Sequence, residues 1–208
     1  MITYSNIVRY DGLPFDEYLK LPALSHSFLK REKMGITEDL KMTDNIRIGS
    51  LVDDIITQPS KADMYSPLYP YARNIAAVIR NRFGSLINQF QKQVSYTADA
   101  SFGDFTMPVK GRLDFLIPNL AVIDLKVTMS KDLRGLIEFM GYKNQDWHYS
   151  KLSIVPNAYL MIYSIPLKKT EIVKVDCSSN DNPFWGDKIT KFGKVLYKPN
   201  DEIRLVTH

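Results

Sequence analysis

The sequence predicts an α/β (or α+β) protein in which a mixed central β-sheet is flanked by helices. Three observations support this fold class. Two runs rich in β-branched and apolar residues within 111–128 are separated by the turn signal Pro118-Asn119, a pattern typical of a β-hairpin. Residues 46–57 carry apolar side chains at helical spacing. Apolar runs at 159–167 and 170–176 predict two later strands that add antiparallel pairs to the sheet.

Length and composition suit one soluble globular domain. The chain has 208 residues, of which 45% are hydrophobic and 24% charged, enough for a core of ordinary size. We therefore expect residues 1–208 to form a single domain with its core at about 24–176. No stretch has the pattern of a signal peptide or a membrane span, so we expect a cytoplasmic protein without membrane contact. The net charge of +4 mildly favours a polyanionic partner.

Cysteine and histidine are too few for several classes of site. Cys177 is the only cysteine, so no disulfide can form within the chain and a reducing compartment is expected. The three histidines, His26, His148 and His208, are scattered, which argues against a structural zinc site.

The N-terminal part of the chain predicts short elements. A strand is expected at 2–4, followed by a turn at Asp11-Gly12. A short helix follows from Ser25, because serine is a favourable N-cap, and Gly35 can end it.

The helix at 46–57 is the clearest in the sequence, and Pro59 ends it. Its apolar face consists of Ile48, Leu51, Val52, Ile55 and Ile56. At about 100° per residue, Asp53 and Asp54 flank this face on opposite sides. Either carboxylate could reach a cleft beside the helix, and the alternative is that both are solvated.

A tyrosine- and proline-rich loop at 63–71 leads into a second, longer helix expected at 71–91. Residues 93–96 then open the sheet, and a turn at Gly103 leads into the strand 107–117.

After the hairpin, residues 132–140 are expected to form a helix or a loop that Gly141 breaks. The following helix carries Gln145 and Tyr149, which are four residues apart and so share one face. A last helix is expected at 183–194.

The hairpin carries charged residues in strands that otherwise look buried. Side chains alternate along a strand, so Asp124 and Lys126 share one face. A two-residue loop at Pro118-Asn119 would point Asp114 away from that face, whereas a three-residue loop or a bulge would place Asp114 opposite Asp124. We predict the odd-length loop or the bulge.

Two carboxylates and a lysine on one face predict a site for a hard cation. Such oxygen ligands suit Mg²⁺, for which Mn²⁺ can substitute. Lys126 could orient or help deprotonate a metal-bound water, and the metal could stabilise charge on a phosphate. The alternative is an Asp–Lys salt bridge on a solvated sheet face. Lys110 and Arg112 share the face of Asp114 by alternation, so they are candidates for phosphate contacts or for partners of the carboxylates.

These motifs resemble the core of the PD-(D/E)xK phosphodiesterase superfamily. Leu113-Asp114 stands where its name has Pro-Asp, and Asp124-Leu125-Lys126 matches Asp-x-Lys. Gln145 and Tyr149 fit the Gln-x-x-x-Tyr motif of the RecB-like branch, which includes phage recombination exonucleases of the lambda and RecE type. Residues 49–53 resemble the Gly-[Ser/Thr]-x-x-His helix of RecE-like nucleases, with aspartate in place of histidine.

The resemblance covers roughly residues 24–165. It implies a restriction-endonuclease-like core and a Mg²⁺-dependent deoxyribonuclease, with a phage-type exonuclease of DNA recombination or processing favoured. The implied metal ligands are Asp53, Asp114, Asp124 and the carbonyl of Leu125. Lys126 would activate water, and Gln145, with Tyr149 beside it, would position DNA or that water. The candidate nucleic-acid contacts are Lys110, Arg112, Gln145 and Tyr149.

Departures from the family pattern leave alternatives open. Relatives of the lambda type have a glutamate near the first strand, where this chain has Gln93, and Asp53 replaces the usual histidine. A catalytically inactive DNA- or protein-binding module on the same fold is therefore an alternative, as is an endonuclease. The lone Cys177 excludes the iron-sulfur subclass, which needs four cysteines. Expected partners are DNA and a single-strand annealing or binding protein, in the cytoplasm of a bacterial or phage-infected cell. The sequence does not indicate an oligomeric state.

Overall fold

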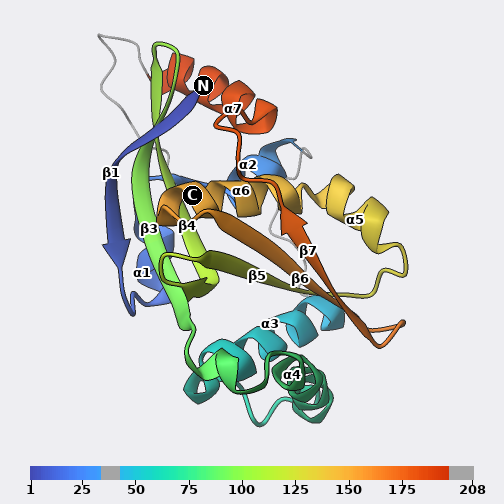
Figure 1. Ribbon diagram of the computed structural model, residues 1–208. Helices are drawn as coiled ribbons and strands as arrows, with labels where there is room; N and C mark the ends of the chain where they lie inside the picture. The colour runs from blue at the N-terminus through green and yellow to red at the C-terminus, as the bar shows by residue number, and fades with distance from the viewer. Residues whose placement is uncertain (34–42, 197–208) are drawn as a thin grey trace.

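The computed structural model describes residues 1–33 and 43–196. It has a mixed seven-stranded sheet in the order β1-β3-β4-β5-β6-β7, with β2 paired to β4 (Figure 1). The strands are β1 (Ile2–Tyr10), β2 (Leu24–Ser25), β3 (Gln91–Phe102), β4 (Phe105–Ile117), β5 (Ala121–Thr128), β6 (Asn157–Ser164) and β7 (Lys169–Val175). This confirms the predicted α/β fold class with a mixed central sheet flanked by helices.

Seven α-helices surround this sheet in the described part of the chain (Figure 1). They are α1 (Phe15–Lys20), α2 (His26–Lys33), α3 (Asp44–Thr57), α4 (Tyr69–Phe83), α5 (Leu133–Met140), α6 (Tyr142–Ser153) and α7 (Pro183–Leu196). Two short 3₁₀ helices, η1 (Pro59–Lys61) and η2 (Gly84–Asn88), follow α3 and α4. Among these helices, none is long and apolar enough to cross a membrane.

Two helix layers bury opposite faces of the central strands. Helices α3 and α4 pack on the face that carries Ile123, Leu125 and Met161. Helices α6 and α7 pack on strands β3 and β4 with Val122 in the same cluster. Because residues alternate along β5, Asp124 faces the α6 side while Leu125 faces α3. The core also includes Ile2 of β1 and Trp185 of α7, so it extends beyond residues 24–176.

Helix α3 forms where its sequence pattern predicts it. The Thr43 side chain caps its N-terminus by accepting a hydrogen bond from the backbone N–H of Ile46. The five predicted apolar positions are all buried against α4 and the sheet: Ile48, Leu51, Val52, Ile55 and Ile56.

Several predicted elements differ in extent from the observed ones. The helix expected at 71–91 ends at Phe83, because Gly84 takes a positive φ of 60°, which an α-helix cannot continue. The strand expected at 2–4 continues to Tyr10 through an irregularity between Ser5 and Val8. Gly35, predicted to end the helix that begins near Ser25, lies outside the described residues.

The pairing of the later strands was predicted only in part. Strands β6 and β7 are antiparallel, as predicted, but β5 and β6 are parallel. Helices α5 and α6 form the crossover between them, which parallel neighbours require. Asp132 caps α5 through the N–H of Gly135, and Gly141 ends it with φ of 64°.

The hairpin has the predicted odd-length loop. Ile117 pairs with Ala121, which leaves the three residues 118–120 in the turn and Asn119 with φ of 61°. By this register Asp114 and Asp124 stand opposite each other, as predicted. The paired part of β4 and β5 ends at Phe115 and Ile123, so the two strands separate at the two aspartates.

Candidate functional site

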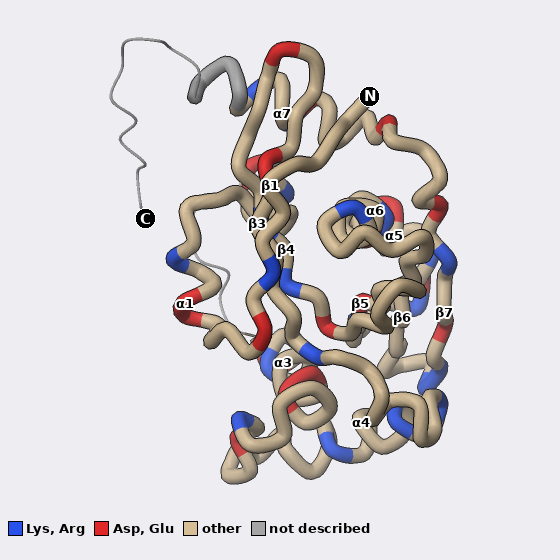
Figure 2. Tube along the Cα trace, turned by 60° about the vertical axis from the view of Figure 1, so that its left-hand side comes forward, with Lys and Arg blue, Asp and Glu red and all other residues tan. Residues whose placement is uncertain are grey.

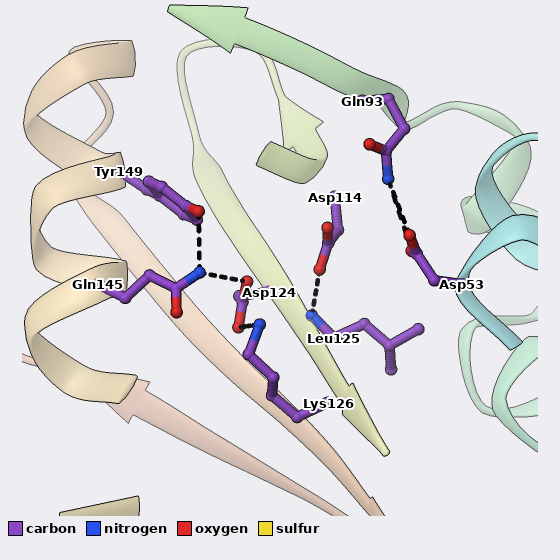
Figure 3. Close-up of polar contacts among 8 residues, drawn as sticks. All are labelled: Asp53, Gln93, Asp114, Asp124, Leu125, Lys126, Gln145 and Tyr149. Atoms are coloured by element: carbon purple, nitrogen blue, oxygen red, sulfur yellow. Dashed lines mark hydrogen bonds and ion pairs between the residues drawn. The ribbon is translucent and has the colours of Figure 1, made fainter. Parts of the chain in front are cut away.

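The separation of β4 and β5 lets the Asp114 carboxylate enter the gap between the strands. Its Oδ2 accepts a hydrogen bond of 2.8 Å from the backbone N–H of Leu125 (Figure 3). This bond replaces the strand pairing that ends one residue earlier. Asp114 is thereby held between Asp53 of α3 and Asp124 of β5 (Figure 3).

Helix α6 holds Asp124 from the other side. Gln145 donates its side-chain amide to Asp124 Oδ1 over 3.2 Å and to the Tyr149 hydroxyl over 2.8 Å (Figure 3). The other oxygen, Asp124 Oδ2, lies 2.5 Å from Lys126 Nζ in an ion pair. Asp124 is only 2% exposed, whereas the side chain of Lys126 is 23% exposed, so the ion pair reaches the surface on the lysine side.

A third carboxylate reaches the site from α3. Asp53 accepts hydrogen bonds from the side-chain amide of Gln93, at 3.3 Å to Oδ2 and 3.5 Å to Oδ1 (Figure 3). Gln93 in turn accepts a bond of 2.7 Å from Arg112 Nε and donates one to the hydroxyl of Thr57. Gln93 adopts a left-handed conformation with φ of 54°, which is uncommon for a residue other than glycine. Gln93 therefore positions Asp53, a role that the sequence did not indicate.

The three carboxylates disfavour one another's charge. Burial, followed by the charges of Asp53 and Asp124, raises the pKa of Asp114 well above its ordinary value. Burial and the nearby charge of Asp54 raise the pKa of Asp53 to about 6. A cation placed among these groups would relieve both effects, since it favours the ionised forms.

Lys126 is the positive charge in this cluster. Burial disfavours the charged form, but Asp124 and Asp114 outweigh that effect and raise the pKa of Lys126 above its ordinary value. Lys126 therefore stays an ammonium here, which suits it to hold or orient an oxygen atom. The sequence-based idea that it helps to deprotonate water gains no support from this geometry.

The donor set fits a hard divalent cation in its chemistry. Carboxylate and carbonyl oxygens are the ligands that Mg²⁺ and Mn²⁺ prefer. Asp124 Oδ2 is buried and accepts no hydrogen bond beside its ion pair with Lys126. Within residues 1–33 and 43–196, no three His, Cys, Asp or Glu side chains lie close enough to hold a metal ion as they stand. The predicted ligands are Asp53, Asp114, Asp124 and the carbonyl of Leu125, and metal binding by them stays a prediction.

Lys110 and Arg112 have structural partners. Lys110 Nζ donates to the carbonyls of Tyr18, Leu19 and Leu21 at 2.9–3.1 Å. Arg112 Nη1 donates to the carbonyl of Leu13 over 2.7 Å, besides its bond to Gln93. Both side chains thus tie α1 and its flanking residues to β4. Their predicted contact with nucleic acid stays a prediction.

Asp146 is a further carboxylate that the sequence analysis did not single out. It is fully buried on α6, and neither of its oxygens has a hydrogen-bond partner. Burial, with the charges of Asp124 and Asp114, raises its pKa well above the ordinary value. Only its place next to Gln145 in the sequence could have drawn attention to it.

Figure 2 shows acidic and basic residues together where β4 and β5 approach α3.

Comparisons with known proteins support the fold. No protein-family model matches the chain, and no curated protein matches it either. Among solved structures, it is similar to one described as a "Putative exonuclease" from Eubacterium rectale, with 17% identity and a TM-score of 0.58. The match covers 89% of this chain and 84% of that one. At this identity the likeness shows a common fold.

Two other solved structures are similar at lower scores. The protein SSO0001 matches with 14% identity over 89% of this chain and 87% of its own, with a TM-score of 0.45. Candida albicans Rai1, in a complex with pU5-Mn2+, matches with 15% identity over 98% of this chain and 58% of its own, with a TM-score of 0.37.

Proposed function

We propose that the protein is a metal-dependent nuclease that hydrolyses phosphodiester bonds. The observation that carries this proposal is the separation of β4 and β5, which brings Asp114, Asp124 and Lys126 together. More specifically, we propose a Mg²⁺-dependent deoxyribonuclease of the phage exonuclease type, acting in DNA recombination or processing. The resemblance in four sequence motifs supports this narrower assignment. A single-strand annealing or binding protein is the proposed partner, in the cytoplasm of a bacterial or phage-infected cell.

The proposed metal ligands are Asp53, Asp114, Asp124 and the carbonyl of Leu125. A metal ion bound there would act as a Lewis acid on the phosphate and lower the pKa of a bound water. Lys126 would turn from Asp124 toward the substrate and donate hydrogen bonds to a phosphate oxygen or to the attacking water.

Helix α6 supplies the positioning groups of the proposed reaction. Gln145 holds Asp124 Oδ1 and so orients the carboxylate that faces the phosphate. The Tyr149 hydroxyl accepts from Gln145 and keeps its own O–H free to donate to a phosphate oxygen. Burial raises the pKa of Tyr149 well above its ordinary value, so it remains a donor at every working pH.

The decisive test incubates the pure protein with linear and circular duplex DNA, and with RNA, in Mg²⁺, Mn²⁺ or EDTA. Lys126→Ala is compared with Lys174→Ala, which removes the same charge from an exposed position on β7. Metal-dependent loss of linear DNA alone, abolished only by Lys126→Ala, is the expected result. Cleavage of circles would instead indicate an endonuclease.

A binding module on the same fold is the second candidate function. It is favoured because each carboxylate already has a partner within the chain. Asp53 accepts a hydrogen bond from Gln93, Asp114 accepts one from the backbone N–H of Leu125, and Asp124 is paired with Lys126. Binding of DNA without cleavage in either metal would support this candidate against the first.

A further inference from the structure

Lys30 of α2 is a half-buried cation without an anionic partner among the described residues. Its Nζ lies 5.5 Å from the centre of the Tyr142 ring. Burial, together with the charge of Lys126, lowers the pKa of Lys30 to about 8. The lysines near it differ in this respect, because each of them forms an ion pair with a carboxylate.

The neighbouring basic groups show the contrast. Lys188 and Lys191 of α7 both pair with Glu32, two residues from Lys30 on the same helix. His26, one turn before Lys30, is buried, and burial with the charges of Lys30 and Lys126 lowers its pKa to about 3. His26 is therefore neutral near pH 7 and neither adds to the positive charge of Lys30 nor offsets it. The groups that interact with Lys30 thus include a neutral imidazole, a phenol ring and a second ammonium.

A partly buried ammonium without a counterion is unfavourable, so the site favours the arrival of an anion. When no anion is bound, the Tyr142 ring stabilises the ammonium of Lys30 only modestly. Lys126 Nζ lies 5.4 Å from the centre of the same ring. The two ammonium groups therefore share one aromatic residue, and that residue begins the helix that carries Gln145 and Tyr149.

We propose that Lys30 binds a backbone phosphate of the nucleic acid adjacent to the phosphate that is cleaved. This inference rests on the proposed nuclease function, in which Lys126 contacts the scissile phosphate. A polyanion with regularly spaced phosphates is the ligand that satisfies two cations set around one ring. Lys30 would supply the second contact, and Tyr142 would separate the two ammonium groups while no substrate is bound.

The contact has measurable consequences. One phosphate contact accounts for about 0.9 of the slope of log K against log salt for duplex DNA, and about 0.7 for a single strand. Loss of one charge-assisted hydrogen bond weakens binding by about tenfold or more. Because Lys30 would hold a phosphate that does not react, its loss should raise KM and leave kcat within about threefold.

The test compares Lys30→Met and Lys30→Arg with Lys174→Met as the charge-matched control. DNA binding is measured in EDTA from 50 to 300 mM salt, and kcat and KM are measured in Mg²⁺. We expect Lys30→Met to raise KM about tenfold and to reduce the salt slope by about 0.7 to 0.9. Lys30→Arg should keep KM and the salt slope close to the wild-type values, and Lys174→Met should change neither KM nor the slope. Thermal unfolding should show Lys30→Met at least as stable as wild type, since an unpaired buried charge is removed.

The two proposals fail in different ways. If wild type cleaves DNA while Lys30→Met has an unchanged KM and salt slope, the Lys30 site is overturned and the nuclease stands. If wild type binds but never cleaves, the nuclease proposal fails, and the salt slope alone then decides whether Lys30 contacts a phosphate. If Lys30→Met proves unstable, Lys30→Gln replaces it, and an unchanged slope there overturns the site. If wild type binds no nucleic acid at all, both proposals are wrong.

Discussion

The side chain of Gln145 donates a hydrogen bond to the carboxylate of Asp124 over 3.2 Å. The two residues are 21 positions apart and come from α6 and β5, and both are buried. Helix α6 therefore determines how Asp124 faces the gap between β4 and β5. The same amide also reaches the Tyr149 hydroxyl, so one residue organises one side of the site.

Replacing Gln145 with alanine should lower activity more than stability. Partners that orient a metal-ligating carboxylate typically contribute about 10- to 100-fold in metal affinity or activity. We expect Gln145→Ala to reduce kcat/KM by about that factor, measured on linear duplex DNA in Mg²⁺. Gln89→Ala is the matched control, because it removes the same side chain from an exposed position outside the site. Equal activity of Gln145→Ala and wild type would show that Asp124 needs no such support.

Asp53 should make stability depend on pH in the absence of divalent cations. Its pKa is raised to about 6 in the fold from an ordinary value of 3.8, so the folded chain binds the proton more tightly. Its favourable contribution is complete below about pH 4 and is lost as the pH rises through about 6. We expect Asp53→Asn to gain on the order of 1 kcal/mol in unfolding free energy relative to wild type between pH 4 and 7.5.

Urea unfolding in EDTA across that pH range measures this difference. Asp187→Asn, at an exposed position on α7, is the control and should follow wild type. A constant difference between Asp53→Asn and wild type at all pH values would contradict the raised pKa.

Divalent cations should stabilise the fold through the same carboxylates. A ligand that binds only the folded state at 100 times its Kd adds about 2.7 kcal/mol to the unfolding free energy. Mg²⁺ or Mn²⁺ should therefore raise Tm, and more at pH 8 than at pH 5.5, because protons compete for Asp53 and Asp114 at the lower pH. Asp114→Asn should lose most of this shift. An equal shift in wild type and Asp114→Asn would place the metal elsewhere.

Local patterns predicted much of this fold because local contacts form it. The apolar face of α3 and its terminating proline could be identified from spacing alone, and the register of the β4–β5 hairpin followed from the length of its turn. The parallel pairing of β5 and β6 could not be predicted, because it depends on how α5 and α6 pack. The extent of β1 was missed for a related reason, since its pairing with β3 joins residues about 90 positions apart.

In the candidate site, too, some residues could be predicted from local sequence patterns and others could not. Asp114, Asp124 and Lys126 lie on adjoining strands. The alternation of side chains along a strand therefore allowed their proximity to be predicted from the sequence. The link from Arg112 through Gln93 to Asp53 requires the left-handed conformation at Gln93, which no sequence pattern indicates. Lys110 shows the limit of alternation: it predicts the face of a strand but not which groups cover that face.

Lys110 should prove structural when it is replaced. Lys110→Met removes one donor from each of the carbonyls of Tyr18, Leu19 and Leu21, which costs about 1–3 kcal/mol. We expect lower stability in urea and an unchanged salt slope of DNA binding. Lys20→Met removes the same charge from an exposed ion pair with Glu17 and should leave stability close to that of wild type. If Lys110→Met reduced the salt slope by about 0.9, the prediction that Lys110 contacts a phosphate would be supported.

Gly111 should control how closely α6 approaches the sheet. A Cβ atom at this position on β4 would lie 2.7 Å from Leu152 Cδ1 and 2.9 Å from Tyr149 Cε1. Tyr149 is buried and bonded to Gln145, so it cannot move aside without disturbing the support of Asp124. We expect Gly111→Ala to cost about 1–3 kcal/mol in stability and to lower kcat.

The matched control for this change is Gly49→Ala in the interior of α3, where a Cβ atom would meet nothing within 4 Å. Alanine is the better helix former, so Gly49→Ala should be more stable than wild type by up to about 1 kcal/mol. Urea unfolding and the rate of DNA cleavage measure both variants. If Gly111→Ala matched wild type in stability and rate, α6 could shift outward freely, and its contact with β4 would not be what holds Gln145 against Asp124.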